Sequence, residues 1–159
     1  MNPYLTTGNK IESKMPSVYN SIIVSAPIEA VWERISDFHD FSWAPSIIKR
    51  CENVGSKGGT SVGAKRLLNG SFLDTLIAYS SLDHRITYSI DDAPFPISPA
   101  EISNYVGDLH LLPITSEGKT FVEWSGRWES NGTEAIKFMN DIYVILLKDL
   151  AAQFDSQFF

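Results

Sequence analysis

The sequence predicts an α+β fold in which a curved antiparallel sheet wraps around one long C-terminal helix. Short strand-like segments separated by turns fill residues 47–128, and a long helical segment follows at 133–154. Strands followed by a helix are typical of α+β folds. The apolar side chains of the last segment cover an arc of roughly 200° of the helix surface, which is more than one flat sheet can bury. We therefore expect this helix to be covered on two sides.

The N-terminal part is expected to hold one strand and two short helices. The strand is expected over 18–25, around an apolar centre at 22–24. A helix is expected to follow with Pro27 in its first position, because a proline there gives up no N–H that the helix needs. One face of this helix collects Ile28, Val31, Trp32 and Ile35. A turn and a second short helix are expected over 37–45, ended by Pro45.

Further strands bring the predicted sheet to about seven. They are expected over 48–54, 64–68, 72–79, 86–90, 102–112 and 120–128. Asn69-Gly70 is a strong signal for a tight hairpin between two of them. Pro94 and Pro96 lack backbone donors, so the segment 91–96 is expected to form a loop instead of continuing a strand.

Length, charge and cysteine content indicate the number of domains, the kinds of binding partner and the cellular compartment to expect. The 159 residues suit a single domain over 17–159 behind a polar leader at 1–16. The formal net charge is -6 and no basic run occurs, so neither nucleic acid nor an anionic membrane surface is an expected partner. Cys51 is the single cysteine, which suits a reducing compartment.

Targeting and metal-binding signals are also missing from the sequence. No stretch reaches the ~18 continuous apolar residues of a membrane span, and no signal-peptide pattern is visible. We expect a cytoplasmic protein without stable membrane insertion. His39, His84 and His110 lack metal-ligand spacing, so no metal or other cofactor is expected. The oligomeric state stays open between monomer and homodimer.

The order of several short motifs resembles the polyketide cyclase/dehydrase-like branch of the START and birch-pollen-allergen superfamily. The resemblance covers about residues 18–157. Its motifs lie at 25–32, 35–38, 43–45, 63–66, 74–76, 88–90, 104–107 and 122–124. The resemblance implies a helix-grip fold with an internal cavity. It does not imply a single reaction, because members of the family include carriers, ligand sensors and a few enzymes. Two departures are Asp74 in place of the family's glutamate and a third proline, Pro99, in the loop after Ala93.

Arg66 and Asp74 are the charged pair of greatest interest. An odd-numbered hairpin loop would place them opposite each other, whereas a strict two-residue turn would place Lys65 opposite Asp74. An inward Arg66 could orient a carboxylate or carbonyl group of a ligand. An outward pair would be a surface ion pair of small energetic worth. Arg66 shares one strand face with the apolar residues Ala64 and Leu68, which favours the inward orientation of its side chain.

Aromatic and aliphatic side chains are expected to line the space between sheet and helix. Strand alternation predicts that four of them point inward: Tyr105, Leu109, Trp124 and Trp128. Gly107 and Gly126 lie among them and are expected to leave room for a ligand, with a plain packed core as the alternative. Leu76, Phe138 and Ile142 complete the expected lining.

Asp149 and Phe95 are expected to lie at the edge of this space. Asp149 lies within the apolar arc of the long helix, where a carboxylate is costly unless it is paired or wet. The alternative for Asp149 is a frayed, solvated last turn. Phe95 is the only aromatic side chain of the proline-rich loop, so it is expected to turn inward as a lid over the cavity mouth.

These residues favour a protein that binds a small hydrophobic or aromatic molecule, lipid-like or polyketide-like, in an internal cavity. The first alternative is a cyclase or dehydratase acting on a ketone-bearing substrate, but Arg66, Asp74 and Asp149 are the only good candidates for moving a proton there. No catalytic constellation is visible, so the catalytic residues stay unknown. The second alternative is a protein-interaction module, which predicts an open apolar patch.

Overall fold

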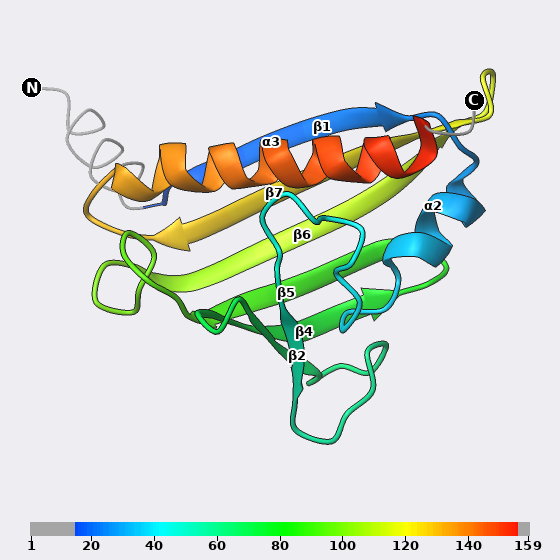
Figure 1. Cartoon of the computed structure of the whole chain (residues 1–159). Coiled ribbons are helices and arrows are strands. Elements are labelled where there is room, and N and C mark those ends of the chain that lie inside the picture. Colours follow the sequence, from blue (N-terminus) through cyan, green and yellow to red (C-terminus); the bar gives the residue numbers. More distant parts are fainter. Residues whose placement is uncertain (1–14, 156–159) are drawn as a thin grey trace, which may run out of the picture.

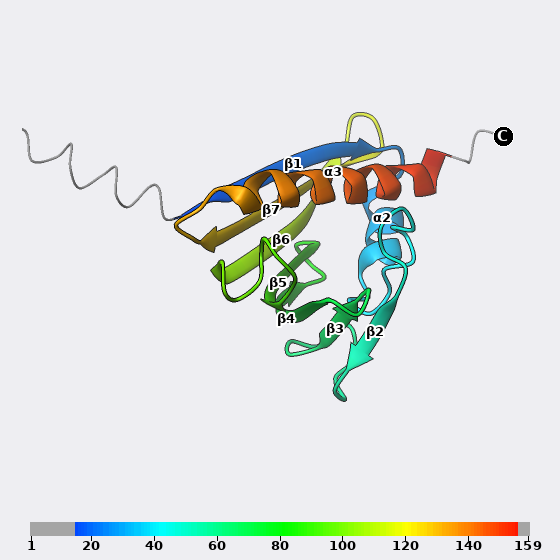
Figure 2. The ribbon, with the colours of Figure 1, turned by 60° about the vertical axis from the view of Figure 1, so that its left-hand side comes forward.

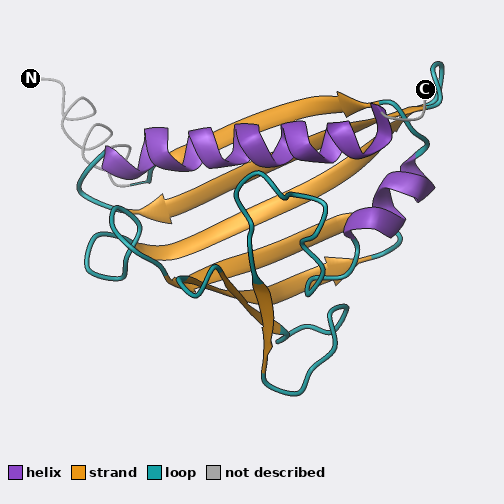
Figure 3. Cartoon of the chain, in the orientation of Figure 1, coloured by secondary structure: helices purple, strands orange, loops and turns teal. Residues whose placement is uncertain are grey.

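The computed structural model describes residues 15–155 and consists of one curved sheet, a short helix and a long helix (Figures 1 and 3). The elements follow the order β1 (Ser17–Val24), α2 (Ile28–Ile35), β2 (Cys51–Val54), β3 (Lys65–Leu68), β4 (Phe72–Ser80), β5 (Arg85–Asp92), β6 (Ser103–Ile114), β7 (Lys119–Glu129) and α3 (Glu134–Asp155). The seven strands have the spatial order β1-β7-β6-β5-β4-β3-β2, and every pair is antiparallel. The predicted curved antiparallel sheet with a long C-terminal helix is confirmed.

The sheet curls from β1 to β2, and α3 lies along its concave side next to β1 (Figure 2). The buried stripe of α3 consists of Ala135, Met139, Tyr143, Leu146, Leu147, Leu150 and Phe154. Phe138 and Ile142 on the flank of this stripe are only partly buried. The wide apolar arc therefore divides into a stripe packed on the sheet and a flank that is less tightly covered.

Helix α2 covers one end of the concave side (Figure 1). It buries Ile28, Val31 and Ile35, as its apolar spacing predicts. Trp32 is half-buried and packs its ring 5.6 Å from the ring of Tyr79. Pro27 is the N-cap of the helix, one position before the expected one.

The second short helix expected over 37–45 is wrong, because this segment forms consecutive turns. Asp37 Oδ1 accepts a hydrogen bond from His39 N (2.9 Å), and Asp40 Oδ1 accepts one from Ser42 N (3.0 Å). An aspartate that bonds the backbone two residues further on competes with helix formation. The turns still bury Phe38 and other aromatic side chains of the segment in the core.

The β3–β4 hairpin has a three-residue loop, because Leu68 pairs with Phe72. Asn69 and Gly70 both have positive φ angles, 53° and 68°, which asparagine and glycine adopt most readily. Asn69 also binds the preceding segment: its Oδ1 accepts from Lys49 N (2.7 Å) and its Nδ2 donates to Ile47 O (2.7 Å). These bonds hold 47–50 outside the sheet, so the strand expected over 48–54 begins only at Cys51.

Two other boundaries differ from expectation. β5 continues to Asp92, which pairs with Leu73, so the loop before Pro94 is shorter than expected. Residues 1–14, most of the expected leader, lie outside the described residues. Pro16 O already accepts a hydrogen bond from Trp128 N (3.1 Å), so residue 16 lies beside the sheet.

Candidate functional site

A pocket of about 190 Å³ lies between the concave face of the sheet and α3. Most of its wall is apolar and comes from three places: the segment before β2, the β3–β4 hairpin and α3. These side chains include Ile47, Ile48, Leu68, Phe72, Ile142 and Leu146. The polar side chains that line it are Arg66, Asn69, Asp74, Tyr88 and Tyr143. An apolar wall with a few polar groups is typical of a small-molecule site.

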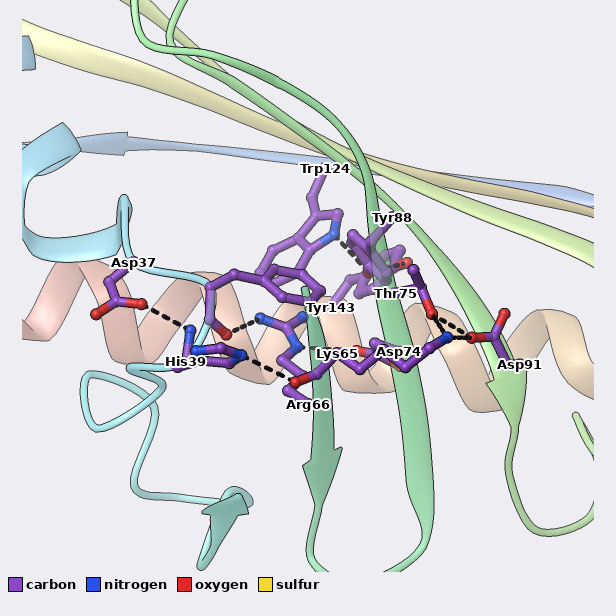
Figure 4. A network of polar contacts seen from close by, with 11 residues as sticks. Asp37, His39, Lys65, Arg66, Asp74, Thr75, Tyr88, Asp91, Trp124 and Tyr143 are labelled. Atoms are coloured by element: carbon purple, nitrogen blue, oxygen red, sulfur yellow. Dashed lines mark hydrogen bonds and ion pairs between the residues drawn. The ribbon is translucent and has the colours of Figure 1, made fainter. Parts of the chain in front are cut away.

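Arg66 and Asp74 face each other across β3 and β4 and point to the inner side of the sheet (Figure 4). Arg66 Nε donates to Asp74 Oδ2 across 3.0 Å, and Arg66 Nη1 donates to Phe38 O across 3.2 Å. The guanidinium lies 3.9 Å from the centroid of the Phe38 ring, a cation–π contact. The two side chains are only 9% and 3% exposed, so the interpretation as a surface ion pair is wrong.

Asp74 is the buried carboxyl group of the pocket. Its Oδ1 has no hydrogen-bond partner among residues 15–155. Burial raises the pKa of Asp74 to about 6, although the positive charge of Arg66 acts in the opposite direction. The pocket therefore holds a carboxyl group that keeps its proton to a higher pH than an ordinary aspartate does.

The next residues along β3 and β4 point to the outer side of the sheet. Lys65 Nζ donates to Thr75 Oγ1 across 2.6 Å and lies 3.4 Å from Asp91 Oδ2. His39 Nε2 donates to Lys65 O across 2.9 Å, which joins the turn segment to β3 (Figure 4). Alternation along the strands thus separates an outer exposed ion pair from the inner buried one.

Three buried tyrosine hydroxyls form a row between the sheet and α3, here called the tyrosine row (Tyr88, Tyr143 and Tyr105). Tyr88 Oη lies 2.8 Å from Tyr143 Oη, which is also bonded to Tyr105 Oη. Trp124 Nε1 donates to Tyr88 Oη across 3.0 Å. Burial raises the pKa of each of the three phenols above its ordinary value. The row is therefore neutral at physiological pH and can both donate and accept hydrogen bonds.

The space beside Gly107 and Gly126 belongs to this row, so the expectation that these glycines leave room for a ligand is wrong. A Cβ at Gly107 would lie 2.2 Å from Tyr88 Cζ, and a Cβ at Gly126 would lie 2.3 Å from Tyr105 Oη. Each glycine allows a tyrosine ring to lie close against the neighbouring strand. The glycines shape the core that carries the hydroxyls.

The structure brings five of the predicted site residues to the pocket: Arg66, Asp74, Trp124, Phe138 and Ile142. The other inward-facing residues of the prediction are buried but do not line it. Leu76 and Leu109 are core residues, and Trp128 stacks on Tyr105 with ring centroids 5.4 Å apart. Tyr105 reaches the pocket only through its bond to Tyr143.

Phe95 does not turn inward. Its exposed fraction is 68%, whereas Ile97 two residues later is 2% exposed. Ile97 N donates to Pro94 O across 3.0 Å, and this turn directs Ile97 instead of Phe95 into the core. The expectation of a lid formed by Phe95 is therefore wrong.

Asp149 does not line the pocket either, and its helical turn is not frayed. Its two carboxylate oxygens accept hydrogen bonds from Ser46 N (2.8 Å) and Ser46 Oγ (2.6 Å). The pair fastens α3 to the segment that carries Ile47 and Ile48 into the pocket wall. Asp149 thus has both carboxylate oxygens paired with Ser46, next to the residues of the pocket wall.

The prediction missed Tyr88 and Tyr143. Both positions carry a signal in the sequence. Tyr88 alternates with Ile86 and Ile90 on one face of β5, and Tyr143 lies four residues after Met139 and four before Leu147 on the buried stripe of α3. Spacing alone shows that these side chains point inward, but their meeting depends on the curvature of the sheet.

A curved antiparallel sheet, a long helix in its concavity and a pocket between them define a helix-grip protein. The chain belongs to the family described as polyketide cyclase/dehydrase and lipid transport, which matches residues 15–155. The expected family is therefore confirmed. No curated protein matches the chain. None of the helices within residues 15–155 is long and apolar enough to cross a membrane.

Several solved structures are similar to this one. A protein from Nitrosospira multiformis is 65% identical, with a TM-score of 0.88, over 89% of this chain and 98% of that chain. A protein from Bacillus thuringiensis is 27% identical, with a TM-score of 0.72, over 87% and 98%. Major latex-like protein 151 from Panax ginseng is 15% identical, with a TM-score of 0.73, over 89% and 98%, and shares the fold.

Proposed function

We propose that this protein binds a small apolar or aromatic molecule in the pocket between the sheet and α3. The observation that carries the proposal is the composition of the pocket wall, in which apolar side chains surround a few inward-facing polar groups. The family description, which includes lipid transport, supports the same class of ligand. The wall is formed by both the concave face of the sheet and α3, so the pocket lies between two layers, which favours a small molecule over a partner protein.

The size of the pocket limits the ligand. Its volume of about 190 Å³ exceeds an engineered cavity of about 150 Å³ that admits benzene. A ligand of one substituted ring fits without movement of the wall. A larger ligand would extend beyond this volume.

Calorimetric titration with toluene tests the proposal. Ile142→Trp places a large ring in the pocket, and Ile145→Trp is the matched control because Ile145 is 36% exposed on the same helix. We expect the wild type and Ile145→Trp to bind toluene and Ile142→Trp to lose binding. Equal binding by both variants, or no binding by the wild type, would contradict the proposal. Native mass spectrometry of the purified protein then shows whether a natural ligand accompanies it.

Asp74 favours a second candidate function, proton transfer on a carbonyl-bearing substrate. A pKa of about 6 suits an acid or base at neutral pH, and Arg66 could stabilise negative charge that develops on the substrate oxygen. The test is exchange of the methyl protons of acetophenone with D₂O, followed by NMR. Faster exchange with the wild type than with Asp74→Asn supports catalysis, and exchange at the buffer rate with both excludes it for this substrate.

A further inference from the structure

Asp74 presents an unused hydrogen-bond acceptor to the pocket. Arg66 occupies Oδ2, while Oδ1 has no partner within the described part of the chain, and the whole residue is 2% exposed. Buried polar atoms are almost always paired, because leaving one unpaired is costly. Asp74 is one of the residues that line the pocket, although Oδ1 itself has almost no accessible surface. The free oxygen calls for a ligand that carries a hydrogen-bond donor.

The tyrosine row has one hydroxyl proton that is not used in a hydrogen bond within the row, so it can donate to a ligand. Three hydroxyls carry three protons, and the two bonds between hydroxyls use two of them. Tyr88 Oη also accepts a hydrogen bond from Trp124 Nε1. The remaining hydroxyl proton lies on Tyr105 or on one of the two pocket-lining members, Tyr88 and Tyr143. On Tyr105, which is 2% exposed and bonds no other group among residues 15–155, it would be buried without an acceptor.

The unused proton is therefore favoured on the pocket side of the row. Asp74 lies opposite Ile90 and Tyr88 lies opposite Leu76, which makes Asp74 and Tyr88 diagonal neighbours on the inner face of β4 and β5. The acceptor and the donor thus belong to one part of the wall.

The charge of the pocket selects the kind of donor. Arg66 already neutralises Asp74 at 3.0 Å, so a cationic donor such as an ammonium would add an uncompensated charge beside the guanidinium. A neutral hydroxyl adds no charge. It can donate one hydrogen bond and accept another.

We propose that the pocket selects ligands with a phenolic or enolic hydroxyl, whose O–H donates a hydrogen bond to Asp74 Oδ1 and whose oxygen accepts one from the unused O–H of the tyrosine row. The inference rests on the proposed function, since it names the ligand class of the same pocket. It adds a specificity-determining role for Asp74 that a purely apolar pocket would not have.

Calorimetric titration of the wild type with phenol, anisole, toluene and benzylamine tests the inference. Phenol donates and accepts, anisole only accepts, and toluene does neither. A hydrogen bond to a charged group is worth about tenfold or more in affinity. We expect phenol to bind about tenfold more tightly than anisole, anisole more tightly than toluene, and benzylamine no more tightly than toluene.

Two variants locate the effect. In Asp74→Asn the amide can turn its NH₂ toward the pocket, so we expect the advantage of phenol over anisole to disappear. Asp91→Asn is the matched control, because Asp91 is a carboxylate on the outer side of the neighbouring strand. It should keep the wild-type ratio. An advantage that survives in Asp74→Asn would overturn the role of Asp74.

The wild-type series decides the inference even if Asp74→Asn fails to fold. Equal affinities for phenol, anisole and toluene would overturn the selection for a hydroxyl group and leave the proposed function intact. This result is expected if a bound water already donates a hydrogen bond to Asp74 Oδ1. Tighter binding of benzylamine than of phenol would overturn the choice of a neutral donor. Failure of all four probes to bind would overturn the proposed function and this inference together.

Discussion

Arg66 Nε donates to Asp74 Oδ2 across 3.0 Å on the concave side of the sheet, where both side chains are almost fully buried. The other carboxylate oxygen faces no partner within residues 15–155. A buried ion pair is a weak source of stability, but breaking one by removal of a single partner is strongly destabilising. The pair is therefore best understood as a polar feature that the apolar pocket retains at some energetic cost.

Arg66→Met should lower the free energy of unfolding by roughly 3–5 kcal/mol, because it leaves Asp74 buried without its cation. The double variant Arg66→Met/Asp74→Leu should be less destabilised than Arg66→Met alone, since it removes both charges. Urea denaturation at pH 8 measures both. A double variant less stable than the single one would show that the pair itself is a major source of stability.

The contribution of Asp74 to stability should depend on pH in a stated direction. Burial raises its pKa in the folded protein from 3.8 to about 6, so the folded state holds the proton to higher pH than the unfolded chain does. The stability that this residue contributes is therefore fully present below pH 3.8 and is lost as the pH rises to about 6. The loss amounts to roughly 1.4 kcal/mol for each pH unit of that interval.

The difference in unfolding free energy between the wild type and Asp74→Asn isolates this contribution. Arg66 and Asp91 are the charged groups that act on Asp74, and both remain in the variant. Carboxyl groups with lowered pKa values, such as Asp40 and Glu123, cancel in the difference. The wild type should lose stability relative to the variant between pH 4 and pH 6. A constant difference would show that the pKa of Asp74 is the same in the folded and unfolded states.

Gly126→Ala should destabilise the protein by roughly 1–3 kcal/mol, because its Cβ would overlap Tyr105 Oη and disturb the tyrosine row. Gly58→Ala is the control, since no atom lies within 4 Å of the Cβ position there. Thermal denaturation followed by circular dichroism compares the two. Equal melting temperatures would mean that the row has space for an additional methyl group.

Asp149→Ala should release Ser46 and loosen the segment that carries Ile47 and Ile48 into the pocket wall. We expect a loss of about 1–3 kcal/mol in stability and faster dissociation of toluene, measured by NMR exchange. Asp141→Ala on the exposed side of α3 is the control and should change neither quantity measurably. An unchanged dissociation rate in Asp149→Ala would show that this segment does not control access to the pocket.

Phe95→Ala should leave stability nearly unchanged, because Phe95 is 68% exposed. Ile97→Ala should cost roughly 2–5 kcal/mol, because Ile97 lies in the core. Urea denaturation of both variants measures the contrast. A larger loss in Phe95→Ala would restore the interpretation of Phe95 as a covering residue.

The periodicity of apolar residues predicted most of the fold, because these residues alternate along strands and recur every three or four positions along helices. The inward faces of β6 and β7 hold Tyr105, Leu109, Trp124 and Trp128 as expected, and α3 begins one residue from its expected start. The segment 37–45 was predicted wrongly because Asp37 and Asp40 bond the backbone locally, an effect that apolar spacing does not reveal.

The site was harder to predict, because it depends on contacts between distant segments. Arg66 and Asp74 belong to one hairpin, so an odd loop length suffices to place them together. Tyr88 and Tyr143 are 55 residues apart, and only the curvature of the sheet brings their hydroxyls into contact. Asp149 and Ser46 are 103 residues apart, so the partner of a carboxylate in an apolar arc could not be identified from the helix alone.

Methyl NMR of the protein titrated with toluene tests the central claim most directly, because it reports where an apolar molecule binds. The methyl groups of Ile47, Ile142 and Leu146 lie in the pocket wall, whereas those of Ile23 and Leu82 are exposed, at 52% and 87%. The pocket account predicts saturable shifts of Ile47, Ile142 and Leu146 with no change at Ile23 and Leu82. Shifts confined to the exposed methyl groups, or no shifts at all, would contradict it.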